Sequence, residues 1–238
     1  MTDLHTHILP GMDDGAVSLR NSIMLLQKEL EEGVDRVALT PHFYHSRESQ
    51  THFLDRRARA YDRLLEYRVT LPPGVRKRLP ATILAAEVEW QPDMENWSHL
   101  EELCYQNTKL LLVELPFYPW SEDLINKLYD LMSATGLTPV IAHIDRYLDV
   151  QKKELLQELY SIGLPMQLSG EALLHLRSRE KALKLLRDET AQYVISDCHN
   201  LKDRKPNMGM ALDVVEKKLG KGKADRLAWL SDRLLFGE

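Results

Sequence analysis

Two histidines near the start of the chain, His5 and His7, have the spacing of paired metal ligands. They stand two residues apart in the largely apolar stretch MTDLHTHILP. Alternate residues of a strand point to the same face, so both imidazole rings are expected on one side. A polar turn containing Asp13 and Asp14 follows, and imidazoles with nearby carboxylates suit a divalent transition metal. An isolated pair of this kind is more often two half-buried structural histidines, so the rest of the chain must decide between the two interpretations.

Histidines and carboxylates recur at the ends of the later predicted strands. In parallel α/β folds, ligand-binding side chains gather at the carboxyl ends of the strands. Chance would place one such residue there, but not one at nearly every strand of a chain with only nine histidines. We therefore predict one shared metal site. Its candidate ligands are His5, His7, Asp14, His42, Glu87, Glu114, His143, Asp197 and His199.

This set of side chains exceeds the coordination number of one ion. Two or three divalent ions that share a bridging carboxylate would use all of them. The mixture of imidazole and carboxylate without thiolate favours manganese, iron or zinc over copper. Metal ions a few ångströms apart can hold a hydroxide nucleophile and both changing oxygens of a phosphoryl transfer, so we predict that chemistry.

Two arginines, Arg146 and Arg204, follow the ends of two of these strands by a few residues. Guanidinium groups bind phosphate oxygens bidentately, so both are candidate substrate-binding and catalytic residues. A surface salt bridge is the alternative for each. Cys198 and Arg204 also match the C-x5-R spacing of cysteine-dependent phosphatases, but the loop between them lacks glycine. Such a loop must cradle phosphate with backbone N–H groups, so we predict that Cys198 is only a small residue in a crowded loop.

The elements that must position these residues are seven predicted strands that alternate with helices, the pattern of a parallel α/β fold. The stretch LLLVEL is a near-continuous apolar run, typical of a parallel strand buried on both faces. The first strand contains His5, and the others are predicted at Asp35–Thr40, Ala81–Trp90, Leu110–Leu115, Pro139–His143, within Gly163–Ser169 and at Gln192–Ser196. Helices are predicted at Val17–Glu32, Leu54–Tyr67, Ser121–Thr135, Val150–Ile162, Glu171–Leu186, Pro206–Leu219 and Ala224–Leu235. The polar stretch Phe43–Phe53 is expected to be a mobile loop.

Length and composition narrow the class of protein. A chain of 238 residues suits one large core, so residues 1–238 are predicted to form a single domain. The net charge of −5 argues against non-specific binding to nucleic acid or to anionic membranes. No apolar run approaches membrane-spanning length, and the N-terminus lacks the pattern of a signal peptide. Two cysteines are too few for a disulfide framework, so the cytoplasm is the expected compartment.

Six stretches of the chain carry a family resemblance. They are DLHTHILPGMDDGA, the TPH of residues 40–42, AAEVEW, LLVELP, IAHIDRY and SDCHNLKDRKPN, and they span most of the chain in order. The sequence resembles the polymerase-and-histidinol-phosphatase (PHP) superfamily. Within it, the chain is similar to the bacterial manganese-dependent protein-tyrosine phosphatases of capsule and exopolysaccharide operons.

The resemblance implies a distorted (β/α)7 barrel with a trinuclear site at the carboxyl ends of the strands. The three implied ligand sets are His5, His7, Glu87 and Asp197 for one ion, Glu87, Glu114 and His143 for a second, and Asp14, His42 and His199 for a third. Arg146 and Arg204 would bind the phosphate. The implied cofactor is Mn2+, with iron or zinc as options from the donor set.

The resemblance also implies a reaction and a partner. Phosphotyrosine would be hydrolysed by a metal-bound hydroxide without a phosphocysteine intermediate, and the usual substrate would be the tyrosine-rich tail of a cognate tyrosine autokinase that controls polysaccharide export. Some members form ring-shaped oligomers. The stretch QLSGEALL and the loop Phe43–Phe53 depart from the usual pattern and could alter substrate choice. Two alternatives stay open: a small-molecule phosphatase, such as a histidinol-phosphate phosphatase, and a non-catalytic module that binds phosphoproteins.

Overall fold

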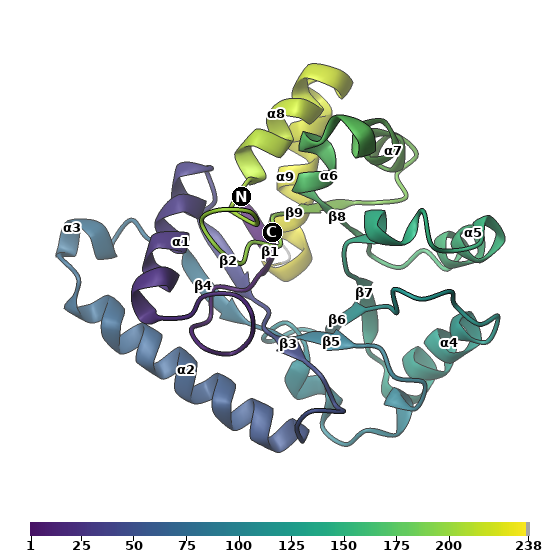
Figure 1. Ribbon diagram of the computed structural model, residues 1–238, viewed down its shortest axis with the longest axis horizontal. Coiled ribbons are helices and arrows are strands. Elements are labelled where there is room, and N and C mark those ends of the chain that lie inside the picture. The colour runs from purple at the N-terminus through teal and green to yellow at the C-terminus, as the bar shows by residue number, and fades with distance from the viewer. Residues whose placement is uncertain (237–238) are drawn as a thin grey trace.

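The computed structural model describes residues 1–236, in which short strands alternate with helices (Figure 1). The strands are β1 (Thr2–Thr6), β2 (Arg36–Leu39), β3 (His42–Phe43), β4 (Ala81–Leu84), β5 (Glu87–Glu89), β6 (Leu110–Glu114), β7 (Thr138–Ile141), β8 (Gln167–Ser169) and β9 (Tyr193–Ile195). The α-helices are α1 (Leu19–Glu31), α2 (Gln50–Thr70), α3 (Pro73–Arg76), α4 (Leu124–Thr135), α5 (Lys153–Ser161), α6 (Gly170–Leu174), α7 (Leu176–Arg187), α8 (Met208–Leu219) and α9 (Lys221–Phe236). Three 3₁₀ turns lie at Met94–Asn96, Leu100–Leu103 and Ile144–Tyr147.

The strands form a ring with the helices outside it (Figure 1). Three parallel sheets have the orders β1-β2-β4, β3-β5-β6-β7 and β8-β9. A bridge between Thr6 and Cys198 joins β1 to the end of β9, and a bridge between Ile141 and Met166 joins β7 to the start of β8. Because β2 continues into β3 and β4 into β5 after short breaks, the nine segments occupy seven positions around the ring. This arrangement confirms the predicted distorted (β/α)7 barrel.

The prediction of one strand over Ala81–Trp90 was wrong. The stretch is divided into β4 and β5, which belong to different sheets. At the break, the Ala86 N–H donates to the carbonyl of Leu103, outside the sheet, and the buried Arg57 guanidinium donates to the carbonyl of Ala85. These bonds interrupt the ladder just before Glu87.

Several predicted helix ends differ from the structure by a few residues, and two predicted helices differ more. Helix α2 begins at Gln50 rather than at Leu54, because the Ser49 hydroxyl caps it by accepting from the backbone N–H of His52. The Phe43–Phe53 stretch is therefore only partly a loop. The predicted helix Glu171–Leu186 is broken at His175, whose backbone is extended. The Arg179 guanidinium satisfies the carbonyls of Leu173 and Leu174 that the break leaves free.

The pattern of burial in β6 explains how the barrel supports a polar site. Leu111 and Val113 pack into the large apolar cluster that joins strands to helices. Leu112 points to the other side, in a small cluster with Ala38 and Val140. Alternate residues of a strand share a face, so Leu112 lies on the same side as Glu114, one step nearer the carboxyl end of the strand. The small cluster therefore packs beneath the polar residues at that end.

No helix within residues 1–236 is both long enough and apolar enough to cross a membrane.

Candidate metal centre

All nine predicted ligands lie at the carboxyl end of the barrel, and donor atoms of seven of them form three overlapping groups. They come from β1 and the loop after it, from β3, β5 and β6, and from the segments after β7 and β9. Within each group, one donor atom per residue lies within 4.8 Å of the others. The groups are His5, His7 and Glu87; His42, Glu87 and Glu114; and His7, Asp14, His42 and His199.

The innermost ligands surround one point. His5 Nε2 lies 3.2 Å from both His7 Nε2 and Glu87 Oε2. His7 Nε2 lies 3.3 Å from Glu87 Oε2 and from Asp197 Oδ1. Each of these four residues is at most 2% exposed. Four donor atoms that face one another in a buried space are the arrangement that a divalent ion requires.

Glu87 also reaches the neighbouring ligands. Its Oε1 lies 2.9 Å from His143 Nε2, and its Oε2 lies 2.9 Å from His42 Nδ1. Glu114 completes this side, with Oε1 3.4 Å from His143 Nε2 and Oε2 3.9 Å from His42 Nδ1. One carboxylate in contact with both groups has the position of a bridging ligand.

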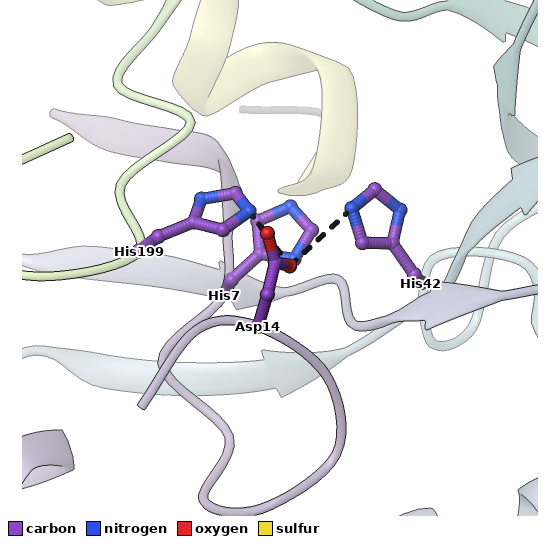
Figure 2. A group of neighbouring side chains, drawn as sticks. All are labelled: His7, Asp14, His42 and His199. Atoms are coloured by element: carbon purple, nitrogen blue, oxygen red, sulfur yellow. Dashed lines mark ion pairs between the residues drawn. The ribbon is translucent and has the colours of Figure 1, made fainter. Parts of the chain in front are cut away.

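Asp14 lies at the open side of the centre. Figure 2 shows its carboxylate between the imidazoles of His42 and His199, with His7 beside them. Asp14 Oδ1 lies 3.3 Å from His199 Nε2 and 3.8 Å from His42 Nε2. The Asp14 side chain is 66% exposed, whereas the His199 side chain is 1% exposed. The outer group therefore combines buried imidazoles with one carboxylate in contact with solvent.

Several buried donor atoms in the centre have no hydrogen-bond partner among residues 1–236. They are His42 Nδ1, Glu87 Oε2, Asp197 Oδ1 and His199 Nε2. Buried polar atoms are normally hydrogen-bonded, and an unsatisfied one costs about 1–3 kcal/mol. Bound cations would satisfy these four atoms, so the donor set fits divalent metal ions.

Hydrogen bonds from outside the ligand set orient the first two histidines. His7 Nδ1 lies 2.7 Å from Asp13 Oδ2, and His5 Nδ1 lies 2.9 Å from Gln167 Oε1. Both contacts leave Nε2 directed to the centre, and such partners raise the basicity of a ligating imidazole. Burial raises the pKa of Asp13, but the charge of His7 and its hydrogen bond outweigh burial and hold the pKa of Asp13 well below its usual range. Neither Asp13 nor Gln167 was among the predicted site residues, although the paired aspartates of the DDG turn were a signal for Asp13.

Backbone geometry accounts for the DDG turn and for the position of Asp197. A Cβ atom on Gly15 would lie 2.1 Å from the carbonyl oxygen of His7, so only glycine fits there. Asp197 has a φ of 51°, in the left-handed region that is uncommon outside glycine. This conformation turns the chain sharply after β9 and brings the Asp197 carboxylate beside the histidines of β1. Strain of this kind is characteristic of functional sites.

The two predicted phosphate-binding arginines converge on Asp197. Arg146 Nη2 donates to Asp197 Oδ2, and Arg204 Nη2 donates to the same oxygen at 2.7 Å. The other carboxylate oxygen, Oδ1, faces the histidines. Both arginine side chains are 30% exposed. They therefore lie at the solvent side of the centre, adjacent to the ligands.

Cys198 is fully buried and faces away from this chemistry. Its thiol donates to Glu29 Oε1 at 3.3 Å. Burial raises the pKa of the Cys198 thiol well above its usual range, and the nearby Glu29 and Asp3 raise it further. A neutral, enclosed thiol is a poor nucleophile, in agreement with the prediction of a small residue in a crowded loop.

Two aromatic side chains border the centre. The ring of Tyr44 stacks on His42 with a centroid distance of 5.1 Å, and the ring of Phe117 stacks on His143 at 5.8 Å. Phe117 is 47% exposed. No motif singled out Phe117, because the loop before α4 has no helical or strand period.

Comparison with known proteins places this site in a family. The family model described as "Capsular polysaccharide synthesis, CpsB/CapC" matches residues 1–235. The chain belongs to the CpsB/CapC family. A family relative, the tyrosine-protein phosphatase YwqE of Bacillus subtilis, is 29% identical over 228 residues, which cover 92% of this chain and 85% of YwqE. The tyrosine-protein phosphatase CpsB of Streptococcus agalactiae (strain NEM316) is 26% identical over 243 residues, which cover 95% of this chain and 94% of that protein.

Solved structures extend the similarity to three dimensions. A structure from a study of YwqE from Bacillus subtilis and CpsB from Streptococcus pneumoniae, described as unique metal-dependent tyrosine phosphatases, superposes with a TM-score of 0.82. It is 26% identical in sequence, and the match covers 99% of this chain and 94% of that one. An organophosphorus hydrolase from Deinococcus radiodurans matches with a TM-score of 0.55 at 12% identity and supports the fold alone.

Proposed function

We propose that this CpsB/CapC-family chain is a metal-dependent protein-tyrosine phosphatase. The observation that carries the proposal is the convergence on Asp197, which faces two ligand histidines with one oxygen and two arginines with the other. A phosphate bound by the arginines would therefore lie next to the metal ligands. The names of the family relatives, tyrosine-protein phosphatases that match over most of this chain, support the choice of substrate.

The proposed cofactor is Mn2+, as two or three ions, with iron or zinc as alternatives that the same donors accept. His5, His7, Glu87 and Asp197 would hold one ion, Glu87, Glu114 and His143 a second, and Asp14, His42 and His199 a third. Divalent ions in these positions supply a lowered pKa for bound water and charge stabilisation of phosphate oxygens.

Arg146 and Arg204 would hold and orient the phosphate. A guanidinium group has five N–H donors in one plane, so each arginine can keep its bond to Asp197 and donate to a phosphate oxygen with another N–H. The bond to Asp197 restrains each side chain before substrate binds, which reduces the entropy lost on binding. Asp197 would thus act as a ligand and as a positioning residue.

Tyr44 and Phe117 offer apolar surface for an aromatic leaving group. Each ring stacks on a proposed ligand histidine, next to where the phosphate would lie. The phenyl ring of phosphotyrosine would extend the stack, whereas an alkyl phosphate would gain less from it. We further propose that the substrate is the tail of a cognate tyrosine autokinase in the cytoplasm, a compartment that suits the free thiols of Cys104 and Cys198.

The test compares a phosphotyrosine peptide with histidinol phosphate as substrates. Metal-free protein should be inactive, and added Mn2+ should restore turnover of the peptide even after treatment with a thiol-alkylating reagent. Turnover restricted to histidinol phosphate would replace the proposal with a small-molecule phosphatase. Metal-loaded protein that binds the peptide without turnover would instead be a phosphoprotein-binding module.

A further inference from the structure

A cavity at the metal centre continues along the surface to helix α2. The inner cavity, of about 410 Å3, is lined by Asp14, His42 and Tyr44 among others. The outer cavity, of about 420 Å3, lies between the loop after β1 and the middle of α2; Figure 1 shows that loop beside the helix. Met12 and Arg56 line both cavities. The two therefore form one path that leads from the proposed active site.

Arginines line this path over its length. Arg47 lies in the inner cavity, Arg56 lines both, and Arg59 and Arg63 lie in the outer one. We call these four residues the arginine groove. Arg56, Arg59 and Arg63 are spaced three and then four residues apart along α2, so they share one face of the helix. Asp62 is the one carboxylate among the residues that line the outer cavity.

The inner half of the groove is held in place by local contacts. The Arg56 guanidinium donates to both Glu48 carboxylate oxygens, at 2.6 and 3.0 Å, and to the Met12 carbonyl at 3.3 Å. The Arg47 guanidinium lies 4.1 Å above the ring of Tyr44, which itself stacks on His42. Arg47 is therefore one aromatic ring away from a proposed metal ligand.

The outer half of the groove contains two arginines that form no ion pair within the described residues. Arg59 and Arg63 are exposed, and no ion pair or side-chain hydrogen bond within residues 1–236 involves either of them. Like charges four residues apart on a helix repel and destabilise it slightly. Within residues 1–236 no ion pair compensates this repulsion, and the two side chains lie on the path to the active site.

We propose that the arginine groove binds acidic side chains of the substrate protein next to the phosphotyrosine. The inference rests on the proposed phosphatase function and adds a preference for Asp and Glu near the phosphorylated tyrosine. Arg59 and Arg63 are about 6 Å apart along the helix axis. Alternate residues of an extended peptide are about 6.6 Å apart. The groove therefore fits carboxylates at alternate positions of an extended segment, each paired with one guanidinium group.

The experiment measures kcat/KM for two phosphotyrosine peptides. One has Glu at alternate positions on both sides of the phosphotyrosine, and the other has Gln there. Wild-type protein should favour the Glu peptide by about three- to tenfold, as expected for two partly exposed charge pairs, and the preference should reside in KM and weaken with salt. In the variant Arg59→Gln/Arg63→Gln, the ratio of kcat/KM for the Glu peptide to kcat/KM for the Gln peptide should fall to about one.

A matched control removes two arginines elsewhere. Arg226→Gln/Arg233→Gln changes the same charge on α9, whose Asp232 binds Thr2 at the amino end of β1, away from the metal centre. It also removes an ion pair with Glu189 and a contact with the ring of Trp229, both on the surface of the protein. This variant should keep the wild-type ratio. The charge-reversed Arg59→Glu/Arg63→Glu should prefer a peptide with Lys in place of Glu.

Four outcomes are decisive. A wild-type ratio near one, or a ratio that Arg59→Gln/Arg63→Gln leaves unchanged, would overturn the arginine groove while leaving the phosphatase function intact. A control variant that loses the preference would show a general effect of protein charge and would also overturn it. Wild-type protein that hydrolyses neither peptide when loaded with metal would contradict the proposed function itself.

Discussion

Two pairs of carboxyl groups are buried almost equally in this protein, and yet their pKa values shift in opposite directions. Glu87 and Asp197 at the metal centre are 1% and 2% exposed, while Asp3 and Glu29 are fully buried. Burial alone raises the pKa of a carboxyl group, because the charged form loses hydration. Burial raises the pKa of Asp3 to about 6 and that of Glu29 well above its usual range, and the charge of Asp3 raises the pKa of Glu29 further.

Neighbouring charges reverse the effect of burial at the metal centre. The charge of His5, aided by other imidazoles, outweighs burial and holds the pKa of Glu87 well below its usual range. At Asp197, His5 and His7 have the same effect, and Arg146 adds to it. Around Glu29, by contrast, the contacts are the hydroxyl of Ser196 and the thiol of Cys198. The surrounding cations therefore lower the pKa of the carboxyl groups at the metal centre, whereas burial raises it at the structural pair.

The largest effect is expected when a substitution removes a negative charge from the metal-centre pair, Glu87 and Asp197. Asp197→Asn keeps the size of the side chain but weakens both a proposed ligand and the acceptor of two arginines. We expect at least a hundredfold loss in kcat/KM for a phosphotyrosine peptide, with less bound metal measured by mass spectrometry. Asp3→Asn makes the same chemical change in the other buried pair and should keep the wild-type metal content. Equal metal content and activity in the two variants would remove the distinction between the pairs.

A smaller effect is expected when a supporting contact of the centre is changed. Asp13→Asn weakens the hydrogen-bond partner of His7 Nδ1 and leaves every proposed metal ligand in place. Metal affinity should fall by about 10- to 100-fold, measured by competition with a fluorescent chelator. Asp225→Asn, an exposed change on α9, serves as the control. An unaltered affinity in Asp13→Asn would mean that the Asp13–His7 contact does not support the centre.

The other carboxyl pair should affect stability rather than activity. The pKa of Glu29 is about 4.5 in the unfolded chain and lies well above that value in the folded protein. Between these two values the folded protein holds a proton on Glu29 that the unfolded chain releases. Stability therefore falls as pH rises from the unfolded value through the folded one. Glu29→Gln removes this loss of stability. It also places a neutral group where Glu29 Oε2 has no hydrogen-bond partner among residues 1–236. We expect the variant to be about 1–3 kcal/mol more stable than wild type at pH 8, with little difference at pH 4, by urea unfolding. A variant less stable than wild type at pH 8 would contradict the assignment.

The smallest effect is expected at the residue that adjoins both pairs. Cys198 follows Asp197 in the chain, but its thiol binds Glu29. Cys198→Ser keeps a donor for Glu29, so kcat/KM should stay within about twofold of wild type. A loss as large as that of Asp197→Asn would assign the thiol to the catalytic centre after all.

Much of the site follows from local rules that a sequence displays. Alternation along a strand places His5 and His7 on one face, and the carboxyl ends of parallel strands bring the distant His42, Glu114 and His143 to one edge. These rules depend on residue type and spacing, so they predicted a parallel α/β fold and the residues that gather at the ends of its strands, while the family resemblance implied the barrel.

Contacts between distant segments were decided only by the tertiary structure. Gln167 binds His5 across 162 residues, and Glu29 binds Cys198 across 169. Which polar side chains meet depends on strand register and on how helices lie over strands, and neither leaves a periodic trace in one segment. The break between β4 and β5 is similar, because Arg57 and Leu103 supply the competing hydrogen bonds from elsewhere in the chain. Local spacing therefore determined which residues reach the carboxyl end of the barrel, while packing across the fold decided what each one binds and in which direction the pKa values of the buried carboxyl groups shift.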